Sequence, residues 1–163
     1  AIGDPLYRPF AKNARYLSPA SSSAIPYKHL REIAQTRSIA EQIQELRNLC
    51  DLHPSYPLYS EQLGLLIQSQ ETSKTINPEA QAAWANAIQL YANGHSPNPH
   101  QQLRLEFHSI NYLREYGERV AALDRLYQLQ LNYRPYPQEL IAIEALIKTL
   151  EEQLESLKVN SNY

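Results

Sequence analysis

From about residue 27 onward, apolar side chains recur every three or four positions, the spacing that places them on one face of an α-helix. Prolines fall between these periodic stretches, and proline is tolerated at the start of a helix but breaks its interior. The alternation with a period of two that is typical of a β-strand is absent from this part of the sequence. The pattern predicts an all-α chain whose helices cover residues 27–35, 38–52, 57–70, 78–93, 99–115, 118–133 and 137–158.

Some of these predicted helices carry their own boundary signals. Ser38 with Glu41 forms a capping-box pattern, and Asn77 stands as the cap before Pro78. The last predicted helix has a heptad seam, with apolar residues spaced alternately three and four apart. Such a seam either closes the end of a helical stack or joins two copies of the chain in a dimer, and the sequence leaves both open. The seam residues are Leu140, Ile143, Ile147, Leu150, Leu154 and Leu157.

Residues 1–25 differ from the helical pattern because they are rich in proline and contain the serine run 21–23. We expect an extended arm there, followed by a helical domain over 26–163. The chain begins with Ala1 and contains no methionine, so we expect a processed chain or a fragment of a longer protein.

Two stretches, 57–93 and 99–135, each consist of a predicted helix, a turn and a second helix. The first stretch combines small residues, which permit close helix approach, with one large aromatic residue. These residues are Leu63, Gly64, Ala80, Trp84 and Ala87, and the arrangement resembles the tetratricopeptide repeat. The resemblance implies a superhelix of about three divergent repeats, with a concave surface lined by the first helix of each pair. An irregular antiparallel bundle of the same helices is the alternative.

Residues 2–10, IGDPLYRPF, carry a second resemblance. They resemble the segment that ends an α/β domain in a family of large bacterial proteins of unknown function, where a tetratricopeptide-like tail follows. The shorter GDP sequence also resembles the last strand of gingipain-type, caspase-like peptidase domains. These resemblances imply that the chain is the C-terminal piece of a larger bacterial protein, and that any catalytic Cys/His dyad lies upstream of it.

Charge and composition exclude several classes of function. The chain has 15 Lys and Arg against 17 Asp and Glu, so no charge excess points to nucleic acid or an anionic membrane. A single cysteine, Cys50, excludes an internal disulfide and a Cys-based zinc site, and leaves the cellular compartment open. The sequence contains no glycine-rich phosphate loop. We therefore expect no cofactor and no metal, and we predict no enzyme.

The chemically active side chains form no recognisable catalytic set. Cys50 falls on the apolar face of its predicted helix, and neighbouring His53 alone does not make a triad. The histidines lack the spacing of metal ligands. The 12 tyrosines suit packing between helices with the hydroxyl at the rim, and a recognition surface is the alternative.

Arg104, Asn111 and Arg114 share one face of the predicted helix 99–115, apart from its apolar stripe. By resemblance to peptide-binding tetratricopeptide grooves, we expect them to contact a partner, with arginine binding a carboxylate and asparagine holding a main chain. Plain exposure to solvent is the alternative. On this view, replacing both arginines by alanine leaves the fold intact and weakens partner binding.

The sequence therefore predicts a non-catalytic protein–protein interaction or scaffold module. The expected partner is a protein segment or the upstream domain of the same chain. Two alternatives are a regulatory C-terminal appendage of a peptidase-like hydrolase, and a small processed helical subunit of a large complex.

Overall fold

The computed structural model describes residues 24–94 and 97–161, and within these ranges it contains seven helices and no strand. The all-α prediction is confirmed. The predicted arm over 1–25 lies mostly outside the described residues, although Ala24 already belongs to the first helix. The helices are α2 (Ala24–Thr36), α3 (Ile39–Leu52), α4 (Pro57–Ser69), α5 (Pro78–Ala92), α6 (Pro99–Glu115), α7 (Arg119–Asn132) and α8 (Pro137–Ser161).

The helix boundaries follow the signals in the sequence. The Ser38 hydroxyl accepts a hydrogen bond from the Glu41 amide at 3.3 Å, and the Asn77 side chain accepts one from the Glu79 amide at 2.8 Å. Both satisfy amides that lack a partner within the first turn of a helix. Gly117 has a φ of 82°, a conformation that favours glycine, and it makes the tight turn between α6 and α7.

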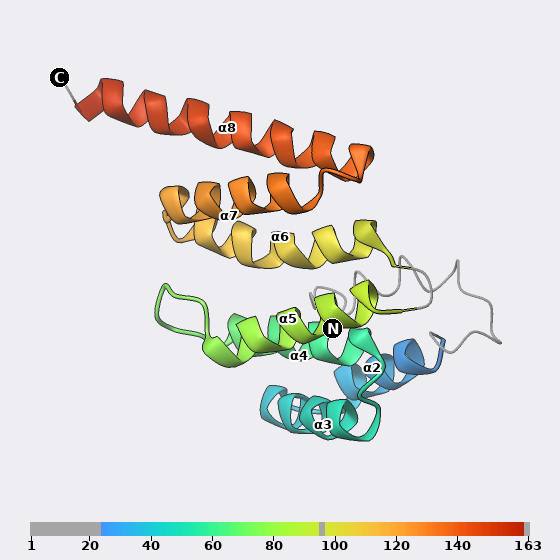
Figure 1. Ribbon diagram of the computed structural model, residues 1–163. Helices are drawn as coiled ribbons and strands as arrows, with labels where there is room; N and C mark the ends of the chain where they lie inside the picture. The colour runs from blue at the N-terminus through green and yellow to red at the C-terminus, as the bar shows by residue number, and fades with distance from the viewer. Residues whose placement is uncertain (1–23, 95–96, 162–163) are drawn as a thin grey trace.

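The helices run back and forth and stack in chain order, from α2 and α3 at one end to α8 at the other (Figure 1). Each helix from α3 onward packs on the next one in the chain. In addition, α2 contacts α3 and α4, and α6 contacts α8. Helix α4 is the most enclosed, because buried residues occur on every side of it. The far end of α8 projects beyond its neighbours (Figure 1).

The buried apolar residues form two separate clusters. The first core joins α2, α3, α4 and α5 with Leu105 of α6, and its largest wholly buried side chains are Trp84 and Tyr59. The second core joins α6, α7 and α8, and it includes Ile143, Ile147 and Leu150 of the heptad seam. The seam therefore closes the stack at these three positions. A dimer through α8 stays a prediction.

Helices α4 and α5 pack closely against each other at Gly64. A Cβ atom on Gly64 would lie 2.5 Å from Nε1 of Trp84 and 3.0 Å from the carbonyl oxygen of Ala80. Trp84 is wholly buried, and its indole N–H has no hydrogen-bond partner among the described residues. The ring therefore contributes by packing alone, and it fills the space that the missing side chain of Gly64 leaves.

We predict that Gly64→Ala destabilises the chain by about 1–3 kcal/mol, because the added methyl group forces the indole ring to shift. Gly94→Ala is the matched control, since the nearest atom to its Cβ position is 3.6 Å away and its backbone is unstrained. Urea unfolding followed by circular dichroism measures both. A Gly64→Ala protein as stable as the Gly94→Ala protein would contradict the prediction.

Candidate functional site

Of the three residues predicted to contact a partner, Arg104 of α6 is bonded to another helix in the described part of the chain. Its guanidinium group binds the carboxylate of Glu61 in α4. Both terminal nitrogens of its guanidinium group donate to the carboxylate, with Nη2 lying 2.7 Å from Oε2 and Nη1 bonded to Oε1. The side chain of Glu61 is only 1% exposed, whereas that of Arg104 is 28% exposed. A carboxylate this deeply buried is stable only when it is paired and hydrogen-bonded.

Two further side chains complete this arrangement. Nε2 of His108 lies 3.1 Å from the same Oε1 of Glu61, and the Gln101 side-chain carbonyl accepts from Nε of Arg104 at 2.6 Å. The helix repeat explains the geometry, because Arg104 and His108 are four residues apart and lie on one face of α6. We call Glu61, Arg104 and His108 the Glu61 cluster.

Charge pairing determines the protonation of the cluster. Burial alone raises the pKa of the Glu61 carboxyl, but the hydrogen bonds and charges of Arg104 and His108 outweigh it and hold the pKa below its usual value. The neighbouring Tyr91 responds in the opposite direction, because burial and the charge of Glu61 raise its pKa to about 12. Glu61 is therefore an ionised, fully engaged group rather than a proton donor.

The other two predicted contact residues lie further along α6. Asn111 is exposed and Arg114 is partly exposed. Nη1 of Arg114 and Oδ1 of Asn111 are 3.5 Å apart, a long hydrogen bond at the surface. The structure thus brings Asn111 and Arg114 together at the surface and holds Arg104 against α4.

This pairing changes the expected consequence of replacing Arg104. Alanine at that position leaves Glu61 buried with its main countercharge gone, so the fold is not expected to remain intact. Glu61 itself was not predicted as a site residue from the sequence. No clear signal for it exists there, because Glu61 shares the less apolar side of 57–70 with Gly64 and Gln68, and only the structure shows that this side is buried.

The remaining candidates occupy structural positions. Cys50 is half-buried with its Sγ 3.7 Å from Oγ of Ser60, and burial raises the pKa of the thiol, which disfavours the reactive thiolate. His53 stacks on Tyr56 with ring centroids 5.3 Å apart. Among residues 24–94 and 97–161, no group of three or more His, Cys, Asp or Glu side chains is placed to hold a metal ion.

The tyrosines divide between the two roles left open by the sequence. Tyr59 is wholly buried and its hydroxyl lies 2.8 Å from Nδ1 of His29. Tyr112 stacks on Trp84 with ring centroids 6.0 Å apart, and Tyr133 is buried in the second core. Tyr127 is 38% exposed. Packing therefore accounts for the first three, and the surface role stays open for Tyr127.

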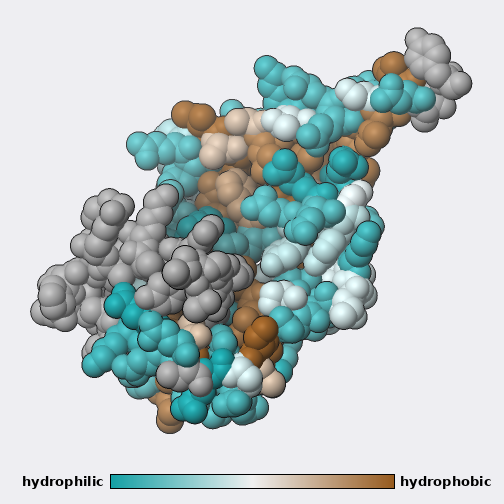
Figure 2. Space-filling model, turned by 180° about the vertical axis from the view of Figure 1, so that it is seen from behind, coloured by the Kyte–Doolittle hydropathy of each residue, from teal (hydrophilic) through white to brown (hydrophobic). Residues whose placement is uncertain are grey.

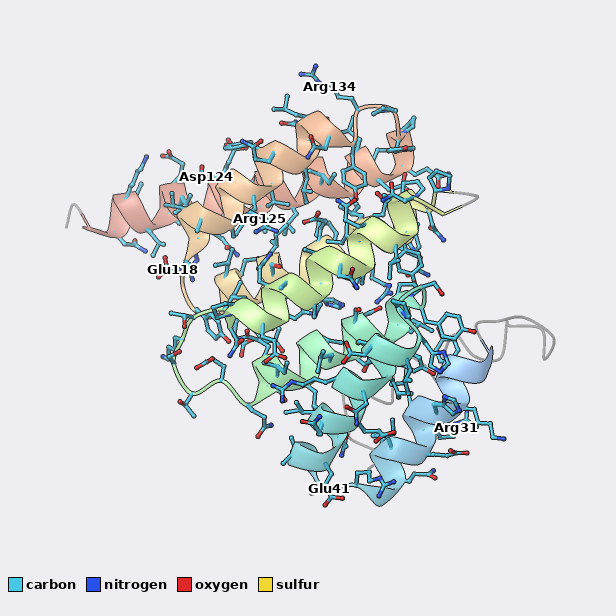
Figure 3. All side chains as sticks on the ribbon, turned by 60° about the horizontal axis from the view of Figure 1, so that its bottom comes forward. Arg31, Glu41, Glu118, Asp124, Arg125 and Arg134 are labelled. Carbon is cyan, nitrogen blue, oxygen red and sulfur yellow. The ribbon has the colours of Figure 1, made fainter. Side chains whose placement is uncertain are left out.

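On the face shown in Figure 2, hydrophilic side chains predominate, and hydrophobic ones gather over the C-terminal helices and in a smaller patch near the opposite end. In Figure 3, Arg134 points away from the stack, whereas Arg125 lies beside the neighbouring helix. Nη2 of Arg125 donates to Oε2 of Glu106 at 3.2 Å, which links α7 to α6. None of the described helices combines the length and the apolar character needed to cross a membrane.

Comparison of the chain with protein-family models, curated proteins and solved structures gives no match. The resemblances of residues 2–10 and of the helix pairs therefore stay predictions, and the candidate site depends on the geometry described above.

We predict that Arg104→Ala destabilises the chain by about 3–5 kcal/mol, the cost of leaving a buried charge without its partner. Arg47→Ala is the matched control, because Arg47 makes the same two-bonded contact with Glu79 while both side chains are 44–45% exposed. Its loss should stay below about 1 kcal/mol. Urea unfolding of both variants checks the difference, and equal losses would show that burial of Glu61 does not matter.

Stability should also depend on pH through Glu61. Because its folded pKa is lower than the usual 4.5, its stabilising contribution is complete above that value and is lost as the pH falls through the lowered folded pKa. Glu61→Gln removes this component, so the variant should lose less stability than the wild-type chain between about pH 6 and pH 3.

The control is Glu79→Gln, whose carboxylate is exposed and contributes little. Free energies of unfolding measured across this pH range decide the matter. Parallel curves for wild type and Glu61→Gln would contradict an ionised, paired Glu61.

Proposed function

We propose that this chain is a non-catalytic interaction module that binds a protein segment on the surface of α6. The observation that carries the proposal is the division of one polar helix face into two parts. Arg104 and His108 are turned inward and held by Glu61, whereas Asn111 and Arg114 remain at the surface.

The surface part has suitable chemistry for a polypeptide. A guanidinium group donates in a fork that fits a carboxylate, and a carboxamide donates to and accepts from a main-chain amide. The bond between Asn111 and Arg114 is long and exposed, so little is lost when both groups turn to a ligand. Arg104 then has a positioning role, since it fixes α6 on α4 and so sets where Asn111 and Arg114 stand.

Other observations support a binding role over a catalytic one. The Cys50 thiol has a raised pKa, and the buried carboxylate of Glu61 is already bonded to Arg104 and His108. Stacked helices expose a broad surface with few backbone groups left unpaired, which suits recognition of another chain. The tetratricopeptide-like resemblance points the same way, and the resemblance of residues 2–10 makes the upstream part of a larger bacterial protein the first partner to test.

The proposal predicts that the Asn111→Ala, Arg114→Ala double variant binds its partner segment about tenfold more weakly, a loss typical of one charge-assisted contact. Segments selected on the wild-type chain from a displayed library of protein fragments serve as ligands. Isothermal titration calorimetry gives the dissociation constants, and circular dichroism confirms that the helices are unchanged.

The matched control is Gln128→Ala, Arg134→Ala, which removes an amide and a guanidinium group from exposed positions elsewhere. Equal weakening by both double variants, or undiminished binding to the Asn111→Ala, Arg114→Ala protein, would overturn the proposal.

A further inference from the structure

The two cores meet at α6, and the contacts across this boundary differ from those inside either core. Leu105 is the one wholly buried α6 residue in the first core, with the half-buried Tyr112 packed beside it. The other apolar residues of α6 turn to the second core. They are Leu103, Phe107, Ile110 and Leu113. By its apolar contacts, α6 therefore belongs mainly with α7 and α8.

Polar side chains add to the link between α6 and the first half, where α6 also packs on α5 and Tyr112 stacks on Trp84. Besides the Glu61 cluster, Nε2 of Gln68 donates to the Tyr116 hydroxyl at 2.7 Å, and the Ser109 hydroxyl donates to Oε1 of Gln81 at 3.3 Å. We call these contacts, together with the Glu61 cluster, the polar interface. Trp84 lies at the edge of the polar interface, with its ring centroid 5.8 Å from that of His108.

Separation across such a boundary is less costly than separation within a core. Interfaces between units of one chain that are small and polar permit relative motion, because water replaces the hydrogen bonds that are lost. Separating α4 from α5 instead uncovers Ala80 and Leu63, which have no substitute for their packing. When the polar interface opens, Leu105 leaves the first core and Trp84 loses the cover of Tyr112, whereas the other buried members of each cluster stay within one half.

We infer that α2–α5 and α6–α8 separate along the polar interface as folded units, at a lower free energy than unfolding of the whole chain. The inference goes beyond the proposed function and does not rest on it. Its consequence is that the position of α6 relative to α4 is adjustable, and that the Glu61–Arg104 contact holds the closed arrangement.

Thiol labelling in the full chain tests this inference. In a Cys50→Ala background, Ser109→Cys places a thiol in the polar interface, where the native side chain is 2% exposed and its hydrogen bond is long. Matched thiols within the cores come from Ala87→Cys and Ala122→Cys, both at wholly buried positions. Labelling rates are measured against urea concentration.

We expect the interface thiol to react at least tenfold faster than both core thiols and with a shallower dependence on urea, because its exposure needs only partial opening. Adding Arg104→Ala should accelerate labelling at position 109 more than at position 122. Identical rates and slopes at all three positions would overturn the inference, since only global unfolding would then expose the boundary.

A second measurement needs no introduced thiol. Trp84 is the single tryptophan of the chain and lies at the boundary. Its quenching by acrylamide should rise at urea concentrations below those at which circular dichroism detects loss of helix. Coincident transitions by the two probes would contradict separate opening of the halves.

Discussion

Burial of the Glu61 carboxylate is the constraint on which the rest of the structure depends. Helix α4 is enclosed on all sides, so a charge in its middle has no access to water and must be paired within the chain. Arg104 and His108 of α6 supply that pairing. Arg104 lies 43 residues after Glu61 in the sequence. A hydrogen-bonded charge pair therefore ties α6 to α4, in addition to the packing of α6 on α5.

This arrangement explains how the two cores form one molecule. Close packing at Gly64 and Trp84 holds α4 to α5, and aliphatic packing at Ile143 and Leu150 holds α8 to the second core. Between them, directional hydrogen bonds set the register of α6. Directional contacts specify one arrangement, yet they contribute less net free energy than apolar burial of similar extent. The same feature orients the surface residues of α6 and links the two cores by directional contacts.

Most of the fold follows from local patterns in the sequence. Helical periodicity and the placement of proline predicted every described helix, and Ser38 and Asn77 predicted the caps that the structure contains. Helix α2 begins three residues before its predicted start, because proline is tolerated within the first turn and Pro26 does not stop it. The pairing of Arg104 was not predictable, since spacing along α6 places its side chain on a face but does not show which distant helix covers that face.

A double-mutant cycle on Glu61 and Arg104 tests the central claim most directly. The free energies of unfolding of Glu61→Gln, Arg104→Gln and the double variant give the coupling between the two side chains. If this pair fixes α6 on α4, the coupling should be about 1–3 kcal/mol, because each single change leaves a buried polar group without its charged partner. Additive losses within about 0.3–0.5 kcal/mol would show that the two side chains do not act together, and the account would fail.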